Sequence, residues 1–159
     1  MFAKPQEQHR WLEQFVGEWT FESECSPGPD QPPMKQTGRT TAHTLGGLWT
    51  LFESEQAGPD GSMMKSIITL GYDPQSQKFV GSFVASMMTF FWVYSGTLDS
   101  AQRKLVLDAT GPRFDTNGMT QYHDIVELVS KDHWILSSEM LGDDGKWLPF
   151  MSSHYRRVS

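Results

Sequence analysis

Residues 67–96 read IITLGY at 67–72, DPQS at 73–76, KFVGSFVASM at 78–87 and TFFWVYSG at 89–96. Three segments rich in β-branched and aromatic residues follow one another here. The connections between them are too short to hold a crossover helix, so neighbouring strands must pair antiparallel. This stretch therefore predicts a β-meander and an all-β fold.

The same pattern of strands and turns extends over most of the chain. Glycine-rich turns at 46–47, 58–61 and 142–145 separate further β-rich segments. About ten strands at even spacing are typical of an up-and-down antiparallel β-barrel, which leaves no exposed sheet edge. Pro149 predicts a bulge or an edge position in the last strand, because proline cannot donate to a ladder. The proline-rich segment 26–33 predicts a long mobile loop.

Residues 5–16 predict one short N-terminal helix. Pro5 suits a first helical position, and Trp11, Leu12 and Phe15 fall on one face of the helix. A short helix with an apolar face must lie on a larger structure. We expect it to cover one end of the barrel, whose strands occupy residues 17–158, within a single domain of 159 residues.

Composition excludes several classes of partner. The net charge of −6 disfavours binding to nucleic acids and to anionic membranes. A single cysteine, Cys25, cannot form an internal disulfide, and the N-terminal residues lack the apolar segment of a secretory signal. No apolar run approaches the roughly 20 residues that span a bilayer. These features predict a cytoplasmic protein with neither nucleic acid nor membrane as its partner.

Short motifs along nearly the whole chain identify a family resemblance. They are Leu12 to Trp19, Leu45 to Trp49, Gly71 to Pro74, Ser86-Met87, Tyr94 to Asp99, Tyr122 to Ile125, Asp144 to Lys146 and Tyr155 to Arg157. In this order they resemble the domain-of-unknown-function family 1579 (DUF1579), a bacterial group of lipocalin-like (calycin) β-barrels. The resemblance implies such a barrel and, by analogy of fold alone, the binding of a small apolar or amphipathic molecule inside it. It implies no catalytic residues.

One departure from the family pattern bears on the ligand. The family commonly has Trp-x-Asp-Ser-Met where this chain has Phe83-Val84-Ala85-Ser86-Met87, so an acidic residue is missing. If that carboxylate serves a ligand in the family, this chain is expected to bind something less polar, or nothing comparable.

Alternation along the strands selects the candidate lining of the barrel. Trp49 and Glu53 share one face of their strand, and Trp92 and Tyr94 share one face of a later strand. The predicted ligand-binding residues are Trp19, Trp49, Met87, Trp92 and Tyr94 for the apolar lining, and Glu53 and His154 for polar contacts. The alternative is that the aromatic side chains fill the barrel and Glu53 faces water, since alternation does not say which face is inside.

The histidines do not have the spacing of a metal site. His43, His123, His133 and His154 lie on different predicted strands, and no cysteine accompanies them. No metal or other cofactor is therefore predicted, with haem as one alternative. Nitrobindin-like barrels, which are related in fold, bind haem iron through a histidine late in the chain, which directs attention to His154. The N-terminal Gly-x-Trp-x-Gly-x-Gly pattern of that group is missing at residues 17–23.

Enzymatic activity stays open, but a binding role is favoured. His123 and Asp124 are adjacent and point to opposite faces of a strand, and the chain has no nucleophile elbow or phosphate-binding loop. Glu53 and Glu139 are a conceivable carboxylate pair inside the barrel. A structural hypothesis also remains: residues 89–94 are apolar on both faces, which favours a filled barrel that acts as a homo-oligomer.

Overall fold

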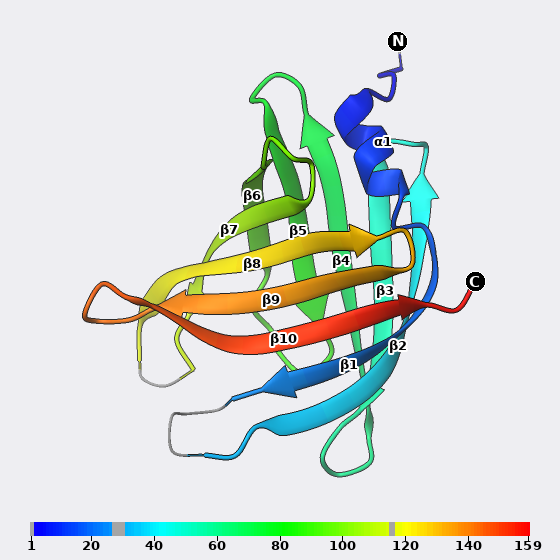
Figure 1. The fold of residues 1–159 in the computed structure, drawn as a ribbon. Helices are drawn as coiled ribbons and strands as arrows, with labels where there is room; N and C mark the ends of the chain where they lie inside the picture. The colour runs from blue at the N-terminus through cyan, green and yellow to red at the C-terminus, as the bar shows by residue number, and fades with distance from the viewer. Residues whose placement is uncertain (1, 27–30, 115–116) are drawn as a thin grey trace.

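The structure is a computed structural model, and it describes residues 2–26, 31–114 and 117–159. Ten antiparallel strands close into a barrel, which confirms the predicted fold class (Figure 1). The strands are β1 (Gly17–Cys25), β2 (Met34–Leu45), β3 (Trp49–Ala57), β4 (Met63–Asp73), β5 (Lys78–Ala85), β6 (Trp92–Leu98), β7 (Lys104–Pro112), β8 (Met119–Ser130), β9 (His133–Leu141) and β10 (Trp147–Arg157). One helix, α1 (Glu7–Glu13), precedes them.

Every strand pairs with its neighbours in the chain, and β1 closes the barrel against β10. Along this seam Trp19 lies opposite Arg157, and Cys25 lies opposite Met151. Because closure leaves no strand edge unpaired, the backbone groups of all ten strands have partners within the sheet.

Two local predictions about turns and bulges are confirmed. Gly46 and Gly47 both have positive φ, 65° and 74°, as a tight primed turn between β2 and β3 requires. The β9–β10 register shifts between Pro149 and Met151, which is the predicted bulge. The predicted long loop at 26–33 includes residues 27–30, which lie outside the described residues, as does Thr116 of a predicted turn.

Two predicted boundaries need correction. The helix ends at Glu13 instead of residue 16, because the amides of Gln14 and Phe15 bond to carbonyls three residues back and tighten the chain into a turn. Strand β6 begins at Trp92 instead of residue 89, because its pairing with β5 stops where Trp92 faces Phe83.

Helix α1 covers one end of the barrel, as expected, and inserts large side chains into it (Figure 1). Phe15, just past the helix, is fully buried and packs edge-on against Trp134 and Phe52, with ring centroids 5.4 and 5.9 Å apart. Trp134 also stacks flat on Tyr155 at 3.7 Å. These interlocking rings fill the helical end of the barrel.

Arg157, the last residue of β10, holds the end of the helical segment in place. Its guanidinium donates to the carbonyl oxygens of Val16 at 2.8 Å and of Gln14 at 2.9 Å. The same group lies over the ring of Trp19 at 4.3 Å and pairs with Asp132 at 3.2 Å. The charge of Arg157 thus satisfies carbonyl groups that the end of α1 leaves without partners.

Within the described part of the chain, no helix has the length and apolar character needed to cross a membrane.

Candidate ligand-binding cavity

A cavity of about 360 Å³ lies inside the barrel at the end away from α1. Its lining residues come from β4 to β10 and from the loops that follow β5 and β7. They are Ile68, Phe83, Met88, Phe90, Trp92, Tyr94, Ala109, Pro112, Arg113, Phe114, Tyr122, Asp124, Leu136, Ser138, Phe150 and Met151. The volume falls in the range of roughly 300–1,000 Å³ that is usual for small-molecule sites.

A carboxyl group stands among these apolar side chains. Asp124, on β8, accepts hydrogen bonds from the hydroxyl groups of two buried residues, Tyr94 on β6 and Ser138 on β9. The Ser138 Oγ to Asp124 Oδ1 distance is 2.5 Å. Tyr94 and Ser138 are only 3% and 5% exposed, whereas Asp124 retains accessible surface and lines the cavity. The carboxyl group is therefore the polar group that a ligand would meet.

Burial changes the acidity of this cluster. It raises the pKa of Asp124, against the opposing effect of the two hydroxyl donors and of the neighbouring His123. Burial, together with the charge of Asp124, raises the pKa of Tyr94 well above its usual value, so its hydroxyl keeps the proton that it donates. Carboxyl groups with raised pKa values in a cavity are common at functional sites.

The other polar groups of the lining are engaged within the protein. The Tyr122 hydroxyl donates to the Pro112 carbonyl oxygen at 2.7 Å. The indole Nε1 of Trp92 donates to Met88 Sδ at 3.3 Å. Arg113 lines the cavity too, and its guanidinium contacts Asp143 at 2.6 Å.

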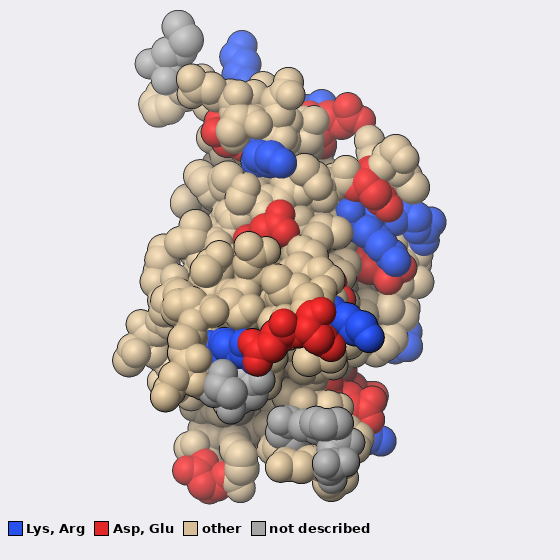
Figure 2. Space-filling model, turned by 90° about the vertical axis from the view of Figure 1, so that its left-hand side faces the viewer, with Lys and Arg blue, Asp and Glu red and all other residues tan. Residues whose placement is uncertain are grey.

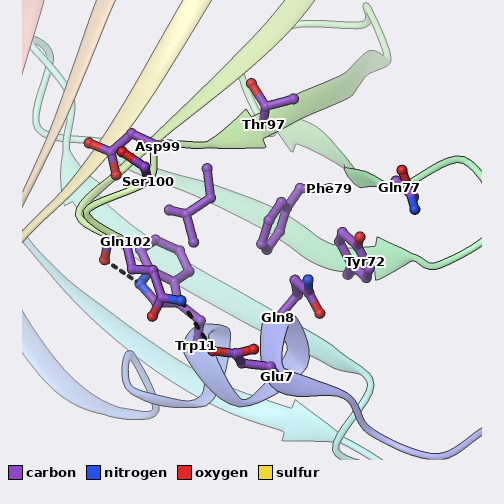
Figure 3. Close-up of a pocket in the computed structure, with 11 residues that line it drawn as sticks. Glu7, Gln8, Trp11, Tyr72, Gln77, Phe79, Thr97, Asp99, Ser100 and Gln102 are labelled. Atoms are coloured by element: carbon purple, nitrogen blue, oxygen red, sulfur yellow. Dashed lines mark hydrogen bonds between the residues drawn. The ribbon is translucent and has the colours of Figure 1, made fainter.

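A second hollow lies at the opposite end, between α1 and the turns after β4 and β6, with a volume of about 280 Å³. Figure 3 shows Glu7, Gln8 and Trp11 of the helix on one side, and Phe79 and Gln102 among the residues across from them. The Trp11 indole donates to the Gln102 carbonyl at 2.7 Å, and the Gln102 amide donates to Glu7 at 3.1 Å. This crevice is a polar surface groove whose hydrogen bonds attach the helix, so the interior cavity is the stronger candidate site.

The sequence profile of a family described as "Protein of unknown function (DUF1579)" matches residues 4–157. The chain belongs to this family. The resemblance found in the sequence motifs is thereby confirmed. A comparison with curated protein sequences found no match.

Solved structures of the same shape are β-barrels of very low sequence identity. Rv2717c from M. tuberculosis is 10% identical, with a TM-score of 0.67 over 98% of this chain and 100% of that chain. The S-type phycobiliprotein lyase CPES from Guillardia theta is 11% identical, with a TM-score of 0.65 over 97% and 94%. EF1p2_mFAP2b bound to DFHBI is 11% identical, with a TM-score of 0.50 over 94% and 98%. At such identities the likeness establishes the fold alone.

Two of the predicted lining residues lie in the cavity of this DUF1579 barrel. Trp92 and Tyr94 both line it, together with Phe90, which shares their face of the chain. Trp92 packs edge-on against Tyr122, with centroids 4.9 Å apart. Trp19 faces inward but lies at the filled, helical end, where its indole donates to the Phe15 carbonyl at 2.9 Å.

The placement predicted for Trp49 and Glu53 is corrected by the structure. Both side chains are on the outer face of β3, because the alternate residues Thr50 and Phe52 take the inner positions and are 2% exposed. Glu53 contacts His43 at 3.6 Å outside the barrel. Met87 is also outside the cavity, and is exposed in the loop after β5.

His154 does not face the interior, since its neighbours Ser153 and Tyr155 hold the inward positions of β10. Its Nδ1 lies 3.0 Å from Nε2 of His133 on the outer surface. The described lining includes no histidine, so these residues do not fit a haem held in the cavity by His154. Among the described residues, no cluster of three or more possible ligands could hold a metal ion.

The carboxylate pair considered from the sequence does not form. Glu139 is on the outer face of β9, where it lies 2.9 Å from Nδ1 of His123. The other nitrogen of His123 is 3.0 Å from Asp108, and its ring stacks on Trp147 at 3.7 Å. His123 therefore belongs to an outer cluster, with Asp124 on the opposite face.

Asp124 is the site residue that sequence reasoning passed over. A signal was present: Tyr122, Asp124 and Val126 alternate along one strand, and the two flanking residues are of the kind that faces a core. The family departure at Ala85 also has a different meaning in this setting. Although the acidic residue is missing on β5, the cavity contains a carboxyl group on β8.

Proposed function

We propose that this protein binds a small apolar or amphipathic molecule in the cavity. The observation that carries the proposal is an enclosed apolar space with one accessible carboxyl group, Asp124, fixed by two hydroxyl donors. Such a combination of an apolar wall and a few placed polar groups is typical of small-molecule sites. The fold neighbours include a phycobiliprotein lyase and a designed barrel bound to DFHBI, which supports the same class of function by analogy.

A titration with Nile red, a neutral dye whose emission rises in apolar surroundings, tests the proposal. The protein is expected to bind about one dye molecule per chain. Trp92→Ala is expected to weaken binding about tenfold, because the ring forms a wall of the cavity. Trp49→Ala is the matched control, since it removes the same side chain from the outer face and is expected to leave the affinity unchanged.

Two results would contradict the proposal. The first is an absence of saturable Nile red binding, and the second is an equal loss of affinity in both tryptophan variants.

A second candidate function, self-association, is favoured by the outer face of the strands next to the cavity. Phe91 and Val93 are 58% and 59% exposed, and Val84 on the neighbouring strand is exposed as well. Most of the surface seen in Figure 2, on the side of the β9–β10 turn, has no charged side chain. We propose a homo-oligomer as the alternative, with Val93→Lys expected to dissociate it in light scattering. A monomeric wild type at high concentration would contradict it.

The compartment proposed from the sequence is the cytoplasm, which cell fractionation would test.

A further inference from the structure

The hydrogen-bonding capacity of the cavity is unbalanced toward acceptors. Tyr94 and Ser138 each use their one hydroxyl proton on Asp124. The donors of Tyr122 and Trp92 are used on Pro112 and Met88. Away from Arg113, the lining thus has few donors left for a ligand, while the Asp124 oxygens have further lone pairs.

The hydroxyl geometry is that of an ionised carboxyl group. Each oxygen of Asp124 accepts from a different hydroxyl group, so a proton on either oxygen would compete with one of these two bonds. The site therefore holds a negative charge against apolar walls.

No cationic side chain has been assigned to neutralise this charge. Arg113 contacts Asp143. His123, the nearest titratable cation, points away and lies between Asp108 and Glu139. A buried charge without an opposite partner is unfavourable, and an entering cation would relieve that cost.

The walls of the cavity also favour a cation. Trp92 and Tyr122 pack at 89° to each other, and Tyr122 and Phe150 at 83°, so ring faces as well as edges are presented around the space. The face of an aromatic ring carries negative charge density and attracts ammonium groups. A neutral or anionic ligand would gain nothing from this arrangement.

We propose that the ligand is a small amphipathic organic cation, with an ammonium group paired to Asp124 and an apolar part among Trp92, Tyr122 and Phe150. This inference rests on the proposed binding function and adds the chemical class of the ligand.

The test compares three probes of equal chain length, hexylammonium, hexanol and hexanoate, by calorimetry and by displacement of Nile red. Hexylammonium is expected to bind about tenfold or more tightly than hexanol, and hexanoate more weakly than both. Asp124→Asn is expected to remove the preference for hexylammonium and to leave the affinity for hexanol near its original value. Glu127→Gln is the control, because it makes the same change of charge on the same strand, in a residue outside the lining.

The outcomes separate the two proposals. If Nile red binds but hexanol or hexanoate equals or exceeds hexylammonium, the cation is overturned and the cavity stands. If neither Nile red nor any of the three probes binds, the proposed function itself fails. Because the ranking of the probes is measured on the wild type, it decides the question even if Asp124→Asn does not fold.

Discussion

At the helical end of the barrel, Phe15 and Trp134 close the interior with interlocking rings, whereas at the other end Trp92 and Tyr122 surround an open space. The same alternation of inward residues supplies both ends. The difference lies in what enters the interior: the segment after α1 inserts Phe15 at one end, and at the other the loops leave room beside a carboxyl group. One end therefore provides stability and the other provides a site.

The largest expected effect tests the filled end. Phe15→Ala is expected to lower the free energy of unfolding by about 3–5 kcal/mol, because it leaves a void among Trp11, Phe52 and Trp134. Phe150→Ala, at the cavity, is expected to cost clearly less. Urea unfolding of both variants measures the contrast, and similar losses at the two ends would remove the distinction between them.

An intermediate effect is expected at Gly111, where β7 passes close to the cavity wall. A Cβ atom there would lie 2.0 Å from Cζ3 of Trp92, so Gly111→Ala must displace the indole. We expect about a tenfold loss of Nile red affinity, equivalent to about 1.4 kcal/mol.

Gly142→Ala in the β9–β10 turn is the control for Gly111→Ala. The nearest atoms to its added Cβ would be 3.2 Å away or more, and the residue is outside the lining. If Gly111→Ala binds Nile red as the wild type does, the ring of Trp92 is not a fixed wall.

The smallest effect is a dependence of stability on pH at the open end. Burial raises the pKa of Asp124 in the folded protein above its value of about 3.9 in an unfolded chain. Between these two values the folded state holds a proton that the unfolded state releases, so the contribution of Asp124 to stability is full at low pH and is lost as the pH rises through this window.

The measurement compares the wild type with Asp124→Asn in urea unfolding at a series of pH values. The stability of the wild type relative to the variant is expected to fall as the pH increases. A relative stability that rises with pH would mean that the folded protein stabilises the ionised carboxyl group even without a ligand.

Local sequence patterns predicted the fold because each of them has a short-range physical cause. The paired glycines at 46 and 47 permit a primed turn, and Pro149 cannot donate to a ladder, so both features could be read from neighbouring residues alone. The ten strands and their order follow from the short connections between them.

The two faces of each strand were harder to assign. In β3, both Trp49 and Phe52 are large and apolar, so alternation alone did not show that Phe52 faces inward and Trp49 outward. The contacts of Asp124 with Tyr94 and Ser138 join residues 30 and 14 positions apart, and such contacts follow from the register of the closed sheet, which single strands do not encode.

The seam between β1 and β10 also has a consequence for the order in which the chain folds on the ribosome. Hairpins from β2 to β9 can form as soon as each pair emerges, because their partners are close in sequence. By contrast β1 must wait for residues 147–157, and so must Arg157, which fixes the end of the helical segment. Closing so long a loop is a slow step. Until synthesis is nearly finished, β1 keeps a free edge that chaperones or a second nascent chain can occupy.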